Sequence, residues 1–189
     1  MSKQALVVLA PGCEELEAVT SIDVLVRGGV KVTVASVCPD GQLQIRASRG
    51  VQLVADCPLR DVADQPFDLI LLPGGLPGAE HLRDTPLLID LLKAQAQRRA
   101  WRAAICAAPA LVLAHHDLIG SAQVTGYPGT EGALGAAYRD QAVVVDEANK
   151  LITSKGPGTA MQFGLAAVAA LQGDAVADQV AAGLLVSRH

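Results

Sequence analysis

The sequence predicts an α/β protein in which a mostly parallel sheet lies between two helical layers. Short apolar runs alternate with amphipathic segments along the chain, which is the order expected of parallel strands connected by helices. Hydrophobic residues make up 51% of the chain and aromatic residues only 3%, so Val, Leu, Ile and Ala must build the core. This composition is typical of a sheet that is covered on both faces.

The first predicted elements are a buried strand and an amphipathic helix. The apolar run at residues 5–10 is typical of a strand with both faces covered. Acidic residues begin the next segment and Arg27 lies near its end, which suits the dipole of a helix over about residues 14–27. Gly28 and Gly29 would end this helix.

The remaining elements follow from apolar patterning and turn residues. Further strands are predicted at residues 31–37, 68–72, 101–105, 123–127, 142–145 and 151–153, with a hairpin at residues 43–47 and 51–55. Further helices are predicted at residues 85–99, 107–115, 158–171 and 174–185. Thr85 and Pro86 suit the N-cap and the first position of their helix.

Several classes of protein are disfavoured by composition. The net charge is −4 and no block of basic residues occurs, so a nucleic-acid-binding surface is not expected. The apolar runs are too short to span a bilayer, and the first residues do not resemble a signal peptide. The four cysteines lack the spacing of zinc ligands. We therefore expect a cytoplasmic protein with one domain over residues 1–189, no membrane segment and no metal.

Ligand sites in such folds collect where strands end and the following helices begin. This rule selects four loops in the sequence. They are residues 11–15, 73–75, 106–108 and 156–159. We expect these loops to meet at one edge of the sheet.

Cys106 is the strongest candidate for chemistry. It directly follows the predicted strand at residues 101–105, and its small neighbours permit the tight strand-to-helix turn of a nucleophile elbow. The start of the next helix would supply partial positive charge and free N–H groups, which favour the reactive thiolate. The alternative interpretation is a structural cysteine buried in an apolar run.

Two other loops contain candidates for the same edge. Residues 73–75 could bring backbone amides to a ligand, although Pro-Gly-Gly is also common in turns without function. Glu17 could turn inward as a buried carboxyl that donates a hydrogen bond to a thiolate. Glu14 and Glu15 are expected to be surface charges that complement the helix dipole.

Five ordered segments together resemble the ThiJ/PfpI superfamily, most closely its branch that contains the YajL proteins and the human Parkinsonism-associated deglycase. The segments are ALVVLAPGCEELE at 5–17, VRGGVKVTVASV at 26–37, LPGGLPGAE at 72–80, AAICAAP at 103–109 and TSKGPGT at 153–159. The resemblance runs from residue 5 to about residue 186. It implies a flavodoxin-like sandwich of the class I glutamine amidotransferase type, and a homodimer.

The resemblance also implies which residues form the site. Cys106 matches the elbow cysteine of the family, and Glu17 matches its acidic hydrogen-bonding partner. The other matching positions are a backbone anion site, two basic residues near the pocket and dimer boundary, and a nearby loop: Gly74, Gly75 and Ala107; Arg27 and Arg49; Gly156 and Pro157. Tyr127 stands where the human relative has a histidine, which argues against general-base catalysis by histidine.

The implied activity is that of a deglycase or glyoxalase, acting on methylglyoxal or glyoxal and on their adducts with proteins or nucleotides. No metal or organic cofactor is implied. The alternative is a redox-sensing chaperone in which Cys106 is oxidised to a sulfinate. A cysteine protease is a weaker third possibility, because none of the histidines is expected beside Cys106.

Overall fold

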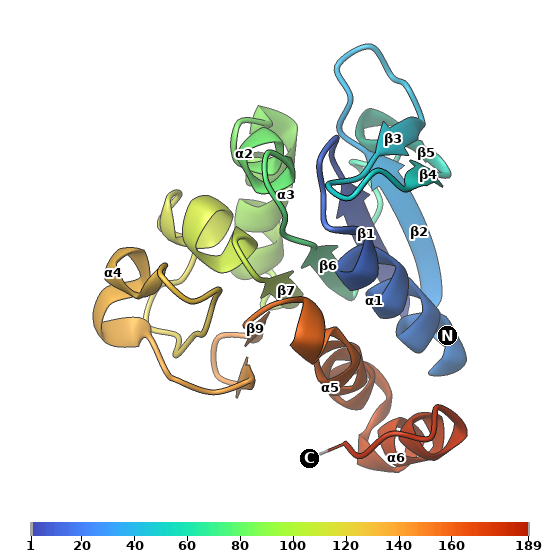
Figure 1. The fold of residues 1–189 in the computed structure, drawn as a ribbon, viewed down its shortest axis with the longest axis vertical. Helices are drawn as coiled ribbons and strands as arrows, with labels where there is room; N and C mark the ends of the chain where they lie inside the picture. Colours follow the sequence, from blue (N-terminus) through green and yellow to red (C-terminus); the bar gives the residue numbers. More distant parts are fainter. Residues whose placement is uncertain (1, 189) are drawn as a thin grey trace.

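The computed structural model describes residues 2–188 and confirms the predicted α/β fold (Figure 1). A seven-stranded sheet has the order β5-β2-β1-β6-β7-β9-β8, in which only β8 runs antiparallel to its neighbour. Its strands are β1 (Gln4–Leu9), β2 (Lys31–Ser36), β5 (Cys57–Pro58), β6 (Leu69–Leu72), β7 (Trp101–Ile105), β8 (Val143–Asp146) and β9 (Leu151–Ser154). A separate hairpin pairs β3 (Gln44–Arg46) with β4 (Gln52–Val54).

Helices cover both faces of the sheet. They are α1 (Glu15–Arg27), α2 (Gly78–Arg83), α3 (Pro86–Gln97), α4 (Glu131–Leu134), α5 (Ala160–Gln172) and α6 (Asp174–Gly183). Short 3-10 turns are η1 (Leu59–Asp61), η3 (Gly135–Ala137) and η4 (Pro157–Thr159), and η2 (Pro109–Ala114) is a π-helical segment. Figure 1 shows α1 packed along α5 on one face, with α2 and α3 on the other.

The central strand β1 shows why the apolar runs in the sequence do not alternate with polar residues. Ala5, Val7 and Leu9 face one hydrophobic core together with α1 and α5, whereas Leu6 and Val8 face a second core beneath α3 and η2. All five side chains are almost completely buried. The two cores lie on opposite faces of one sheet, as parallel strands require.

The packing of α1 against α5 depends on the absence of side chains at the helix crossing. A Cβ atom at Gly164 would lie 2.9 Å from Val24 Cβ, and one at Gly28 would lie 2.7 Å from the Val168 methyl groups. These approaches leave no room for even an alanine. They hold α1, and with it the start of the helix that carries Glu17, close to the sheet.

The predicted strand at residues 123–127 is wrong. Only an isolated bridge between Val124 and Tyr138 forms there. The neighbouring backbone groups are satisfied elsewhere, because Thr125 N donates to Thr153 Oγ1 at 2.8 Å and Tyr127 N donates to the Cys106 carbonyl at 2.8 Å. The segment therefore lies against β9 and the turn after β7 without joining the sheet as a strand.

Other differences concern short elements. The helix predicted at residues 107–115 is the π-helical η2, and Gly158 belongs to the 3-10 turn η4 before α5. The sequence did not predict β5, α2 or α4, which are only two to six residues long. In the part of the chain that the structure describes, no helix combines the length and apolar character needed to cross a membrane.

Candidate functional site

Cys106 lies in a sharp turn immediately after β7. Its φ angle is +65°, in the left-handed region that residues other than glycine rarely occupy. The turn is fixed on both sides, since Cys106 N donates to the Ser154 carbonyl at 2.9 Å and the Cys106 carbonyl accepts from Tyr127 N. The surrounding structure thus holds a backbone conformation that costs about 1–3 kcal/mol. The geometry is that of the predicted nucleophile elbow.

The loop after β6 contacts this turn through backbone alone. A Cβ atom at Gly74 would lie 2.6 Å from Cys106 Cβ, so a side chain at this position would displace the cysteine. Gly75 has φ +87°, and its Cβ would lie 2.5 Å from Glu14 N. The two glycines therefore allow three segments, the loops after β1, β6 and β7, to meet at one point.

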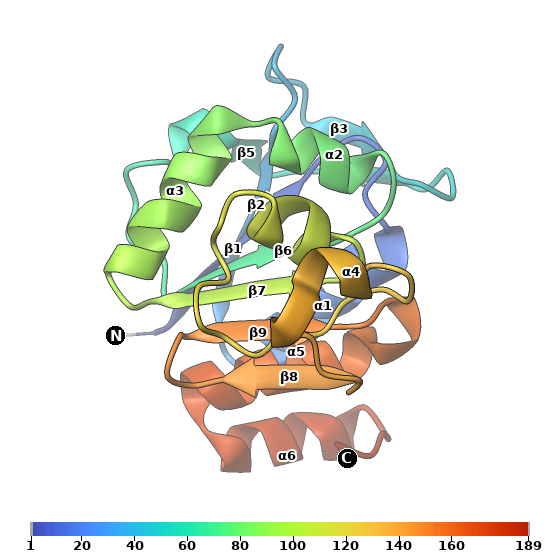
Figure 2. The ribbon, with the colours of Figure 1, turned by 90° about the vertical axis from the view of Figure 1, so that its left-hand side faces the viewer.

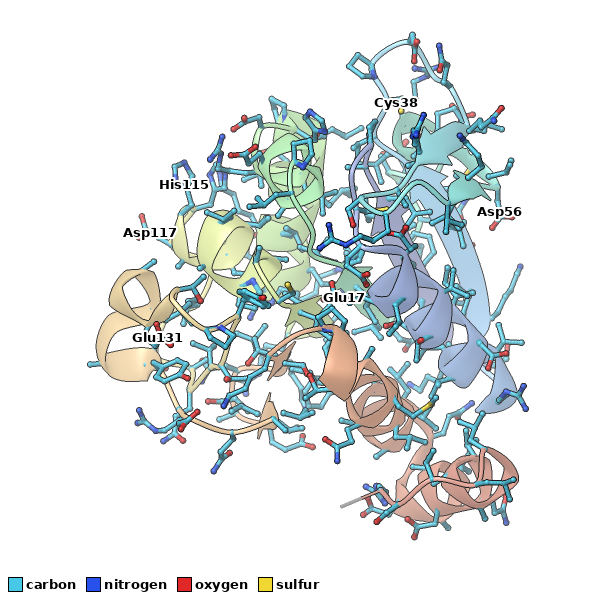
Figure 3. The ribbon with its side chains drawn as sticks, in the orientation of Figure 1. Glu17, Cys38, Asp56, His115, Asp117 and Glu131 are labelled. Carbon is cyan, nitrogen blue, oxygen red and sulfur yellow. The ribbon has the colours of Figure 1, made fainter. Side chains whose placement is uncertain are left out.

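Glu17 is completely buried, and α1 directs its carboxyl toward the cysteine elbow. Figure 3 shows Glu17 near the centre of the molecule. Its Oε2 atom accepts from Gly74 N at 2.7 Å. Its Oε1 atom has no partner of standard hydrogen-bond geometry among residues 2–188, although the Cys106 thiol is close enough to stabilise the charged carboxylate.

Burial raises the pKa of Glu17 to about 7, against the stabilisation that the Gly74 amide and the Cys106 thiol give to its charged form. Burial also raises the pKa of the Cys106 thiol to about 12, and the charge of Glu17 adds to this rise. The amides of Gly75 and Ala107 act in the opposite direction, because they stabilise a thiolate. The direction is opposite to that favoured by the helix terminus, which would lower the pKa of the thiol.

The two values describe one coupled unit. The high pKa of Cys106 is that of a thiol beside an ionised Glu17, so it refers to the second negative charge placed in the same buried site. Between pH about 7 and about 12 the pair therefore carries one negative charge. That charge lies on the carboxylate with a neutral thiol, or on the thiolate with a protonated Glu17. The amide of Gly74 favours the first arrangement, and the amides of Gly75 and Ala107 favour the second.

Glu14 and Glu15 are not the surface charges that the sequence predicted, because both side chains are more than nine-tenths buried. Glu14 is the N-cap of α1, and its Oε2 accepts from Glu17 N at 2.7 Å. Glu15 accepts from Arg49 N at 2.9 Å and from Ser48 Oγ at 3.1 Å, which ties the β3–β4 turn to α1. These hydrogen bonds outweigh the effect of burial and lower the pKa of Glu15.

Tyr127 and Gly156 complete the surroundings of the thiol. A Cβ atom at Gly156 would lie 3.2 Å from the Tyr127 ring and 4.0 Å from Cys106 Sγ, so all three lie together. Pro157 follows as the first residue of η4. Tyr127 is about half exposed and Cys106 is 8% exposed.

The two predicted basic residues lie at different places in the structure. Arg27 is exposed at the last turn of α1, where its Nε donates to Asp23 Oδ2 at 2.7 Å. It lies ten residues beyond Glu17, or about 15 Å along the helix. Within one chain Arg27 is therefore separated from Glu17, and its place near the pocket and dimer boundary stays a prediction. Arg49 is exposed at the tip of the β3–β4 hairpin, where its backbone N donates to Glu15 on α1. Its place near the pocket also stays a prediction.

Two histidines, His81 and His116, lie against backbone carbonyls and not against the cysteine. His81 Nδ1 lies 2.8 Å from the Pro11 carbonyl, and His116 Nε2 lies 2.9 Å from that of Arg83. His115 lies on the outer side of the molecule in Figure 3. Within residues 2–188, no three His, Cys, Asp or Glu side chains are grouped as a metal site would require.

Comparison with known proteins identifies the family of the chain. The model of the DJ-1/PfpI family matches residues 3–170. The chain belongs to the DJ-1/PfpI family. This confirms the predicted superfamily and the flavodoxin-like fold.

Individual members of the DJ-1/PfpI family resemble this chain over nearly its whole length. Protein dj-1beta of Drosophila melanogaster is 44% identical, with 99% of each chain covered, and its crystal structure superposes with a TM-score of 0.93. The structure of oxidised DJ-1 from Toxoplasma gondii gives a TM-score of 0.95 at 38% identity, covering 98% of this chain and all of its own. A Caenorhabditis elegans relative named glutathione-independent glyoxalase is 39% identical over 90% of both chains.

The raised pKa of Glu17 predicts a specific dependence of stability on pH. Since the folded-state pKa of about 7 lies above the ordinary value of 4.5, the folded protein keeps a proton that the unfolded chain has lost between these values. The resulting stability is fully present below pH about 4.5 and is lost as the pH rises through about 7. The free energy of unfolding of the wild type, relative to Glu17→Gln, should fall by about 3 kcal/mol over this range.

Urea unfolding at a series of pH values measures this difference. Gln keeps the shape of the side chain and an oxygen that can accept from Gly74 N, but it does not titrate. The matched control is Glu80→Gln on the exposed side of α2. This variant keeps Glu17, so its free energy of unfolding should fall with pH in parallel with that of the wild type. Parallel pH curves for the wild type and Glu17→Gln would contradict the assignment.

Proposed function

We propose that this protein is a cysteine-dependent glyoxalase and deglycase that acts on methylglyoxal, glyoxal and their adducts. The proposal rests on one observation: the Cys106 thiol shares its buried site with the Glu17 carboxyl and with the amides of Gly75 and Ala107. A nucleophile, a proton carrier and oxyanion donors are the three parts that carbonyl addition requires. The Caenorhabditis elegans relative that is named a glyoxalase supports this type of carbonyl chemistry.

The first step is the addition of the thiolate to the aldehyde. In the form of the pair with protonated Glu17, the Cys106 sulfur attacks the aldehyde carbon, the C–S bond forms and the C=O π bond breaks. The amides of Gly75 and Ala107 stabilise the developing alkoxide. Glu17 then gives its proton to this oxygen. The product is a neutral hemithioacetal beside a Glu17 carboxylate.

The second step moves a proton between the two carbons of the dicarbonyl. The Glu17 carboxylate removes the proton from the carbon bonded to sulfur, and the resulting enediol receives a proton on the neighbouring carbon. This produces a thioester of a 2-hydroxy acid. Water hydrolyses the thioester and regenerates the Cys106 thiol. The sum is dicarbonyl plus water to hydroxy acid, with no external oxidant or reductant.

The pKa of Glu17 suits these exchanges, because a general acid and base works best when its pKa lies near the operating pH. Burial supplies that value of about 7 in a residue that would otherwise remain ionised. In adducts, release of the amine or thiol presents the same two carbons to Cys106. Protection of proteins and nucleotides against carbonyl damage would follow.

A redox-sensing chaperone is the second candidate. Its support is that a sulfinate on Cys106 would meet the same donors, the amides of Gly75 and Ala107 and a protonated Glu17. A relative has been solved in an oxidised form, that of Toxoplasma gondii. Both candidates require the same activated thiol.

We also propose that the protein is a homodimer, formed through α1 and the β3–β4 hairpin. Leu16, Val19 and Val26 lie on one face of α1 and are 50%, 47% and 55% exposed. Val54 on β4 is 71% exposed, and Figure 1 shows the hairpin above the start of α1. Arg49 lies at the edge of this surface. A second copy would cover the apolar side chains.

Turnover separates the two candidate functions. Formation of lactate from methylglyoxal, followed by NMR, should be lost in Cys106→Ser and reduced about 10²- to 10⁴-fold in Glu17→Gln. Cys38→Ser is the matched control, because Cys38 is a half-buried free cysteine outside the site. If the wild type shows no turnover while peroxide oxidises Cys106 ahead of Cys13, Cys38 and Cys57, the redox sensor replaces the enzyme.

The dimer is tested by sedimentation velocity. The wild type should sediment at twice the chain mass of 19.5 kDa, and Val19→Glu should sediment as a monomer. Val145→Glu is the control, since Val145 on β8 is 43% exposed but lies outside the proposed interface. A wild type that stays monomeric at high concentration would refute this assembly.

A further inference from the structure

A second pocket lies at the opposite edge of the sheet from Cys106. It encloses about 270 Å³ between the end of α3, the start of β7, the segment at residues 117–120 and the β8–β9 turn. This is the edge at which β7 begins, and in Figure 2 it lies on the same side as the N-terminus. Arg102 and Cys106 are four residues apart along β7 and its turn, about 13 Å. The pocket is therefore separate from the candidate active site.

Arg102 lines this pocket and is only 4% exposed. Its Nη1 donates to the Leu118 carbonyl at 2.6 Å and its Nη2 to the Asn149 carbonyl at 2.9 Å. Its Nε atom is buried without a partner, and Arg102 forms no ion pair with any carboxylate in residues 2–188. Arginine stays charged in proteins, so a buried cation here lacks an anion.

Two cationic residues and one anionic residue line the pocket. Arg99 also lines it, and its Nη2 donates to the Ala148 carbonyl at 3.2 Å without an ion pair in the described chain. Asp117 is the one carboxylate among the lining residues, and it is exposed. Figure 3 labels it beside His115 on the outer side. Lys150, beside the pocket, is already paired with Glu147 at 2.9 Å.

We propose that this pocket binds a small phosphate group, as inorganic phosphate or a phosphomonoester. The planar guanidinium of Arg102, fixed by two carbonyls, presents its remaining N–H groups to an oxyanion, and Arg99 supplies the second positive charge. A dianion balances the two arginines. It also replaces the water that a buried cation loses on folding.

Three substitutions probe the charges of the site. Arg102→Leu should abolish saturable binding, and it should fold, because replacing a buried charge by an apolar side chain is often neutral or stabilising. Arg99→Gln, on the surface, should weaken binding about tenfold, as expected for one charge-assisted contact. Asp117→Asn should tighten binding severalfold. Asn tolerates the positive φ of +56° that Asp117 has.

Isothermal titration with inorganic phosphate, and separately with glycerol 3-phosphate, at constant ionic strength measures these effects. We expect one site per chain in the wild type and unchanged binding by Cys106→Ser, which excludes binding at the candidate active site. The tighter of the two probes identifies the free ion or the ester as the ligand. No saturable binding by the wild type, or equal binding by Arg102→Leu, would overturn the proposal.

Discussion

The site depends on the hydrogen bond from Gly74 N to Glu17 Oε2, at 2.7 Å. This bond joins the first turn of α1 to the loop after β6. Gly74 also packs so closely against Cys106 that no side chain would fit between them. Three loops from neighbouring parallel strands are thereby held at one point. Any side chain at Gly74 would separate the carboxyl from the sulfur. The close packing of α1 on α5, through Gly28 and Gly164, keeps the helix at the required distance from the sheet.

The same arrangement forces two acids into one buried site. Water cannot screen their charges there, so the site accepts one negative charge much more readily than two. A single shared charge is also what the proposed chemistry uses, since each step moves a proton between Glu17 and the substrate while the sulfur forms or breaks its bond. The buried carboxyl is costly for stability above neutral pH, and it gives the cysteine a proton carrier with a pKa near 7. The destabilising feature and the proposed function therefore have one physical origin.

The sequence predicted the sheet and the elbow because both depend on local pattern. Buried strands read as apolar runs, and small residues around Cys106 permit its turn. The inward direction of Glu17 came only from the family resemblance, because helical spacing does not show which of three nearby glutamates faces the sheet. The surface positions predicted for Glu14 and Glu15 were wrong because the sequence does not show their hydrogen-bond partners, which are the Glu17 amide and the β3–β4 turn.

Residues 123–127 have the composition of a strand, but N–H groups in this segment donate to Thr153 and Cys106 instead of to a neighbouring strand. The unpaired Arg102 in β7 was equally hidden, since a charged residue at the start of a strand normally reaches water.

The shared charge is the central claim, and the rate of Cys106 alkylation as a function of pH tests it most directly. The wild type should show two rises, one near pH 7 as the pair gains its single charge and one toward pH 12 as the second proton leaves. Glu17→Gln should show one rise only, because a single titrating group remains. A single rise at the free-thiol pKa of about 8.5 in both proteins would contradict the account.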